Sequence, residues 1–153
     1  MRILVPALAA LIAAPLSAQT ADAVVDYARM TPIAGNWTSA PIAAGSVATF
    51  RDSSARPQLM ITCARSIRRV TLSRPGTRVS PFLFVWTSSG SRNLPASFDP
   101  ATNLVSAAVT VTDPILDAVA SSRGRFAVGM SGSLALIVPA WPEAARAIED
   151  CRT

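Results

Sequence analysis

Five arginines crowd into one short segment and are the side chains best suited to hold a partner. They are Arg65, Arg68, Arg69, Arg74 and Arg78. The planar guanidinium of arginine binds carboxylates, phosphates and sulfates through paired hydrogen bonds. Two interpretations are open: the segment faces an anionic partner, or it is a solvated surface in a chain whose 14 basic residues are all arginine.

The pattern of the surrounding residues predicts where these guanidinium groups point. Residues 67–73 alternate between apolar and polar side chains, which predicts a strand with Arg69 on its exposed face. Arg74 opens an Arg-Pro-Gly turn signal. We therefore expect Arg65, Arg74 and Arg78 to lie in turns and to converge with Arg69 at the ends of a β-hairpin. Reversing the charges of Arg69 and Arg74 should then abolish binding to lipopolysaccharide or acidic glycan with little change in stability.

A second pair of arginines, Arg123 and Arg125, flanks Gly124 between a predicted helix and a predicted strand. These side chains either form an anion-binding corner or balance the negative end of the helix. Both remain candidate anion-binding residues.

The side-chain inventory removes most catalytic chemistry. The chain has no His and no Lys, which excludes Ser-His and Cys-His pairs, Ser-Lys dyads and Schiff bases. Ser131 lies in Gly-Met-Ser-Gly, which is not the GxSxG nucleophile elbow. We therefore predict no catalytic nucleophile, no metal site and no cofactor.

Two carboxylates keep one enzymatic alternative open. Asp113 and Asp117 are four residues apart, and paired carboxylates cleave glycosidic bonds when one of them has a raised pKa. Asp113, however, precedes Pro114 and suits the N-cap of a helix. Asp117 has the position of a residue on the polar side of that helix.

Three tryptophans, Trp37, Trp86 and Trp141, raise the question of sugar binding. Their flat apolar faces would form a stacking platform if they came together. Large aromatic side chains are also common in the core and at its rim. Both interpretations stay open.

The two cysteines, Cys63 and Cys151, predict one disulfide. Cys63 follows Leu59 and Ile61 on the apolar face of a predicted strand. Cys151 lies at helical spacing from Ile148, on the apolar face of a predicted terminal helix. Both sulfurs are thus expected to point inward.

The first residues have the features of a secretory signal peptide. Residues 1–18 contain Arg2, an apolar run and small residues before a cleavage site after Ala18. The apolar run is shorter than the about 20 residues that span a bilayer. We expect a mature chain that starts near Gln19, has no membrane span and no lipid attachment site, and lies in the periplasm or outside the cell.

The remaining chain predicts one domain of mostly β structure. A lead-in segment, 19–35, precedes a single domain, 36–153. Strands are expected at 46–51, 58–64, 67–73, 82–86, 92–98, 104–112, 125–131 and 134–138, with helices at 114–122 and from Pro142 onward. The strand at 82–86 is expected to be central and buried on both faces. This order predicts an α+β, mostly β fold, either one curved antiparallel sheet or a small sandwich, with the terminal helix linked to it by the disulfide.

Three segments carry a family resemblance: PQLMITCARSIRRVTLSRPG, DPILDAVASSRGRF and VPAWPEAARAIEDCR. They resemble a group of small exported proteins of sphingomonad-type Alphaproteobacteria that are described as hypothetical proteins. The resemblance covers Gly35 to Arg152 and implies export, one domain and a pairing of a strand Cys with a helix Cys. More remotely, the chain is similar to exported invasion-associated proteins and type VI secretion accessory proteins. The other motifs of those families are missing, so no functional residue is carried over.

These observations favour a non-enzymatic binding or interaction module of the cell envelope. Its expected partner is an anionic envelope component or another envelope protein, and export argues against nucleic acid. The net charge of +5 permits an anionic partner without requiring one. The alternative is a carboxylate-dependent enzyme acting on an envelope glycan.

Overall fold

The computed structural model describes residues 26–153, which form two antiparallel sheets and two short helices. The larger sheet has the spatial order β1 (Gly35–Ile42), β2 (Gly45–Asp52), β3 (Pro57–Ala64), β4 (Arg69–Pro75), β8 (Leu104–Thr110) and β7 (Ser97–Asp99). The smaller sheet has the order β10 (Leu136–Pro139), β9 (Arg125–Met130), β5 (Phe82–Thr87) and β6 (Gly90–Pro95). The helices are α1 (Pro114–Ala120) and α2 (Pro142–Glu149), and a 3-10 turn, η1 (Arg65–Ile67), joins β3 to β4. The predicted mostly β class is confirmed.

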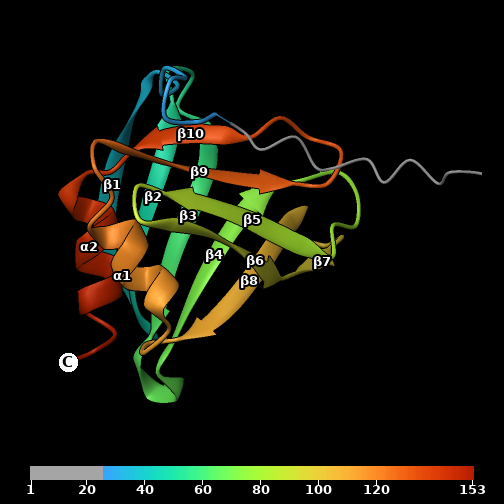
Figure 1. Ribbon diagram of the computed structural model, residues 1–153. Coiled ribbons are helices and arrows are strands. Elements are labelled where there is room, and N and C mark those ends of the chain that lie inside the picture. Colours follow the sequence, from blue (N-terminus) through green and yellow to red (C-terminus); the bar gives the residue numbers. More distant parts are fainter. Residues whose placement is uncertain (1–25) are drawn as a thin grey trace, which may run out of the picture.

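The two sheets face each other across one core, and Figure 1 shows their strands running crosswise. Buried side chains from both sheets meet there, among them Phe50, Leu72, Val85 and Phe126. Helix α2 contacts β1, β2 and β3, and it packs beside α1 at one side of the molecule (Figure 1). The two ends of β3 and β4 therefore have different surroundings, because the helices lie at one of them.

The predicted disulfide is present and links α2's end to the larger sheet. Cys63 in β3 is bonded to Cys151, with their Cα atoms 5.3 Å apart. Both residues are buried, as their positions on apolar faces predicted. Thr62 and Ala64, the neighbours of Cys63 in β3, are only half-buried, which is the alternation expected of a strand with one inner face. The disulfide therefore ties the segment that follows α2 to β3 at the end of the molecule where the helices lie.

Strand β1 was not predicted from the sequence. Only Trp37 of its eight residues is buried, so the strand has almost no apolar alternation. It is the edge of the larger sheet and pairs with β2 over its whole length. An edge strand with one inward anchor leaves little periodic signal in the sequence.

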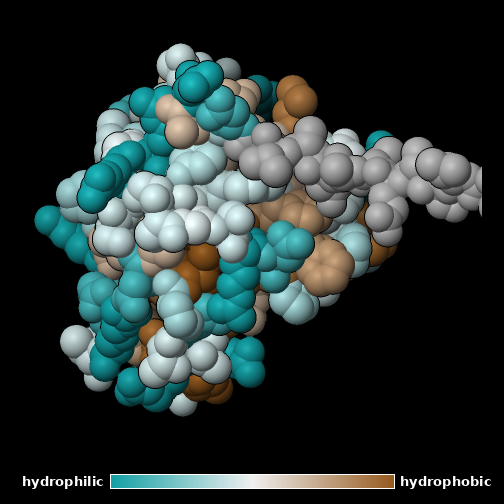
Figure 2. Space-filling model, viewed as in Figure 1, coloured by the Kyte–Doolittle hydropathy of each residue, from teal (hydrophilic) through white to brown (hydrophobic). Residues whose placement is uncertain are grey.

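Strand β5 corrects the expectation of a strand buried on both faces. It is central, between β9 and β6, but only Leu83, Val85 and Thr87 are buried. Its outer face carries Phe82, Phe84 and Trp86, whose rings form a row with centroids 6.4 Å and 6.0 Å apart. Figure 2 shows tan and brown residues gathered near the part of the molecule where this sheet lies in Figure 1.

The predicted strand at 92–98 is two strands in different sheets. Strand β6 ends at Pro95, and β7 begins at Ser97 in the larger sheet. Proline cannot donate a ladder hydrogen bond, and it stands where the chain leaves one sheet for the other. Helix α1 begins as predicted, with the Asp113 carboxylate accepting from the N–H of Ile115. It ends earlier than predicted, at Ala120, so Gly124 does not form its C-cap.

The predicted signal peptide, its cleavage site after Ala18 and most of the lead-in segment lie outside residues 26–153. Within that described range, no helix is long and apolar enough to cross a membrane.

Candidate functional site

The arginines of the predicted hairpin do not come together. Arg69 begins β4 and is exposed, as predicted, and Arg65 in η1 is also exposed. Arg74 lies near the other end of β4, inside the strand and not in a turn. Arg78 is exposed in the loop that follows, beside Gly132. The expectation that these side chains converge is therefore wrong.

Arg74 is buried because the strand continues through it. Val70 and Leu72 point into the core, and Arg74 is the next residue on the same side. Arg74 stands opposite Val105 of β8, which is itself buried. Only 8% of Arg74 is exposed. The chain therefore places a guanidinium at the end of an apolar row, between the two sheets.

The hydrogen bonds of Arg74 leave part of its side chain without a partner. Its Nη1 donates to the carbonyl oxygen of Val128 in β9, at 2.6 Å. Its Nε is buried and has no hydrogen-bond acceptor among residues 26–153. Across that same range, no acidic side chain lies within ion-pair distance of the guanidinium. Burial lowers the pKa of Arg74 to about 10, so the group is still cationic near neutral pH.

An open cleft borders Arg74, at the end of β4 away from the helices. Its volume is about 440 Å³, within the range of about 300–1,000 Å³ typical of small-molecule sites. The polar part of its wall is Arg74, Asp52, Ser53 and Gln58, and the apolar part is Ile33, Ala34, Leu134, Ala135 and Leu136. We call it the Arg74 cleft.

Within the described part of the chain, one carboxylate, that of Asp52, lines this cleft, and it already has hydrogen-bond partners. Asp52 accepts hydrogen bonds from the backbone N–H groups of Ser54 and Arg56 and from Nε2 of Gln58. It also forms an ion pair with the Nε of Arg56, at 3.3 Å. Burial acts to raise the pKa of Asp52, but these hydrogen bonds outweigh it and the pKa is lowered. The negative charge of Asp52 is therefore already compensated by groups of its own turn and does not serve as a counter-charge for Arg74.

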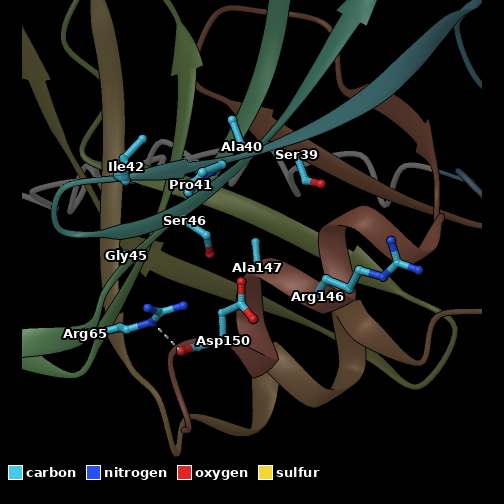
Figure 3. A pocket seen from close by; sticks show the side chains of 10 residues that line it. All are labelled: Ser39, Ala40, Pro41, Ile42, Gly45, Ser46, Arg65, Arg146, Ala147 and Asp150. Atoms are coloured by element: carbon cyan, nitrogen blue, oxygen red, sulfur yellow. Dashed lines mark hydrogen bonds between the residues drawn. The ribbon is translucent and has the colours of Figure 1, made fainter.

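A second cleft lies at the opposite end, between the β1–β2 hairpin and α2 (Figure 3). It has a volume of about 360 Å³. Arg65 borders it and donates from Nε to the carbonyl oxygen of Asp150, at 3.1 Å. Figure 3 shows the Asp150 carboxylate turned into this cleft, whereas the Arg146 guanidinium points away from it. The buried Oγ of Ser46 has no partner among the described residues. Both arginines of this cleft are exposed, so it holds no buried charge that an anion would balance.

The second predicted pair, Arg123 and Arg125, likewise does not form a common site. Arg125 begins β9, is half-buried and donates to the carbonyl oxygen of Met30. Arg123 is exposed in the preceding loop, where its backbone N–H donates to Ser88 Oγ. Arg125 thus anchors residues near the start of the described chain. Of the six candidate arginines, only Arg74 combines burial with a cleft and an unsatisfied donor.

Asp113 and Asp117, the carboxylates of the enzymatic alternative, both make structural contacts. Asp113 caps α1 and forms an ion pair with Arg92, and Asp117 pairs with Arg152 at 2.7 Å. Asp99 accepts from Ala101 N–H and from Thr102, and these hydrogen bonds lower its pKa. A general acid in a glycosidase needs a raised pKa, which is the opposite of what Asp52 and Asp99 have.

The tryptophans do not share one surface. Trp37 is buried against Phe50 and Phe126, and its Nε1 donates to the carbonyl oxygen of Pro139 at 2.8 Å. Trp86 stacks with Phe84 on the outer face of β5. Trp141 is partly exposed at the start of α2. A platform built from all three is excluded by these positions.

No family model, curated protein or solved structure matches this chain. Among the described residues, the Arg74 cleft is the feature whose chemistry points most directly to a ligand.

Proposed function

We propose that this protein is a non-enzymatic binding module of the cell envelope that captures an anionic group at the Arg74 cleft. One observation carries the proposal: Arg74, a buried arginine, lines an open cleft and has no acidic partner among residues 26–153. Anionic ligand binding would supply the missing counter-charge.

The physical reason is the unfavourable free energy of a buried, unpaired charge. Removing a guanidinium from water is strongly unfavourable unless a charge or hydrogen bonds compensate it. Val128 supplies one carbonyl oxygen, and the Nε remains unsatisfied. A bound anion beside the guanidinium would supply a counter-charge and offset the desolvation, so its binding should stabilise the fold.

The envelope location is supported by two features. Residues 1–18 have the composition of a signal peptide. The Cys63–Cys151 disulfide is typical of proteins in oxidising compartments such as the bacterial periplasm.

Titration of the mature, oxidised protein with sodium acetate and sodium phosphate tests the proposal. Shifts of backbone amide NMR signals should locate binding at residues around the Arg74 cleft. The affinity should fall as the sodium chloride concentration rises, because salt screens charges. Arg74→Met should abolish binding. Arg69→Gln is the matched control, because Arg69 is on the same strand but exposed, and it should bind like the wild type. Equal binding by wild type and Arg74→Met, or none by the wild type, would overturn the proposal.

A further inference from the structure

We infer that the ligand of the Arg74 cleft is an amphipathic monoanion, a single carboxylate attached to an apolar chain. The inference rests on the proposed function and adds the chemical class of the ligand. It follows from the way charged and apolar groups are divided around the cleft.

The apolar wall of the cleft is unusual because part of it stands in water. Leu134 is 91% exposed, although it lines the cleft together with Ile33 and Leu136. Ile33 is held beside β10 by its backbone N–H, which donates to the carbonyl oxygen of Ile137 at 3.0 Å. Contact with a hydrocarbon chain would remove this apolar surface from water, which is favourable in proportion to the area covered.

The charged groups favour a head group with one negative charge. Among residues 26–153, Arg74 is the only cation that lines the cleft, and Asp52, whose lowered pKa keeps it ionised at neutral pH, lines it too. A doubly charged phosphate would gain one guanidinium but would also be repelled by Asp52. A monoanionic head group gives a closer match to this charge balance.

The donors of the guanidinium suit a small monoanionic head group such as a carboxylate. Its Nη1 donates to Val128 and its Nε is shielded from water without an acceptor, so Nη2 is the nitrogen left to meet a head group. A carboxylate oxygen can accept a charge-assisted hydrogen bond from it. The head group would therefore lie against Arg74, and the chain would extend along Ile33, Leu134 and Leu136.

A series of ligands of increasing chain length tests the inference by calorimetric titration of the full oxidised protein. Acetate, butanoate, hexanoate and octanoate are the charged probes, and octanamide is the uncharged probe. The affinity should rise about 2- to 4-fold for each added methylene that reaches the wall. Octanamide should bind at least 10-fold more weakly than octanoate, and phosphate should bind more weakly than hexanoate.

Two exposed aliphatic residues, Leu134 and Val79, provide a matched pair of variants. Leu134→Ser should reduce octanoate affinity several-fold and leave acetate affinity unchanged. Val79→Ser is the control, because Val79 is 72% exposed and does not line the cleft, and it should bind like the wild type. Both residues are exposed, so neither change should disturb the fold.

Each outcome separates this inference from the proposed function. Equal affinity for acetate and octanoate would overturn the amphipathic ligand and leave anion binding intact. Octanamide binding as tightly as octanoate would overturn the role of the carboxylate. Tighter binding of phosphate than of hexanoate would overturn the inference that the head group carries a single negative charge. Failure of every anion to bind would overturn the proposed function itself.

Discussion

The two ends of β4 place arginines in opposite environments. At the start of the strand, Arg69 is exposed, and its carbonyl oxygen lies 3.2 Å from the Sγ of Cys151. The disulfide and α2 close this end. At the other end, Arg74 is buried beside an open cleft that strands and loops alone surround.

This contrast separates features that stabilise the fold from a feature that destabilises it. The closed end has a covalent link, a packed helix and arginines that are hydrated by water. The open end has a buried cation whose charge no neighbouring acid balances among residues 26–153. A fold can carry such a group only because the rest of it supplies enough stability, and binding sites are where such groups are commonly found.

The largest effect is expected at the closed end. The variant Cys151→Ser should lower the free energy of unfolding by about 2–5 kcal/mol, because the bridge joins residues 88 apart in sequence. Urea denaturation of the oxidised wild type and the variant measures this change. Acetate binding at the Arg74 cleft should survive in the folded variant. A loss of stability below about 1 kcal/mol would show that the closed end does not depend on its bridge.

An effect of opposite sign is expected at the open end. Arg74→Met replaces a buried charge with an apolar side chain, so the free energy of unfolding should rise by about 1–3 kcal/mol. The penalty from the lowered pKa of Arg74 is fully present below the folded pKa of about 10 and is relieved as the pH rises from there toward the ordinary pKa of arginine. The advantage of the variant should therefore shrink above pH 10. Thermal denaturation at pH 7 and pH 10.5 checks both statements, and Arg69→Met should change stability by less than about 0.5 kcal/mol.

Charge reversal at Arg74 is not the mild change that the sequence suggested. Arg74→Glu would bury a carboxylate beside the Val128 carbonyl oxygen, which accepts the present hydrogen bond. Stability should fall, in contrast to the earlier expectation of little change. The conservative substitution to Met is therefore the informative one.

The next effect concerns Asp52, the carboxylate that lines the Arg74 cleft. Asp52→Asn should lower stability at pH 7, because an amide cannot accept all three hydrogen bonds that the carboxylate accepts. The folded pKa of Asp52 is lowered, so its stabilising contribution is present above the unfolded pKa of about 3.8. That contribution is lost as the pH falls through the folded pKa. Urea midpoints of wild type and Asp52→Asn should thus differ at pH 7 and converge as the pH falls through the folded pKa of Asp52.

The smallest effect is expected at Arg65. Its guanidinium is exposed and donates one hydrogen bond to Asp150, so Arg65→Gln should change the free energy of unfolding by at most about 0.5 kcal/mol. Acetate binding should be unchanged, since Arg65 lies at the end of the molecule opposite the Arg74 cleft. A loss of binding in this variant would place the anion site in the cleft of Figure 3.

Much of the fold was predictable because local periodicity encodes it. The alternation of Leu59, Ile61 and Cys63 placed the inner face of β3 correctly, and Asp113-Pro114 marked the start of α1. The outer face of β5 was mistaken for a buried one. A continuous apolar run has no period, so it cannot show whether Phe84 and Trp86 meet another layer or solvent.

The candidate site was predictable only in part. The sequence identified Arg74 as a residue that could bind an anion, but its place in a cluster with Arg69 and Arg78 was wrong. The rest of the Arg74 cleft comes from segments far apart in the chain, Ile33, Gln58 and Leu134 among them. No local pattern connects these residues.

The sequence by itself determined the phase of β3, the inward direction of both cysteines and the absence of histidine and lysine chemistry. These features depend on the order of side chains and on their types alone. The burial of Arg74 was decided by tertiary structure. The alternation of Val70 and Leu72 extends one residue further than the Arg-Pro-Gly signal suggested, because β8 pairs with β4 as far as Pro75. The smaller sheet then covers that face and turns an arginine that was expected in water into a buried cation beside a cleft.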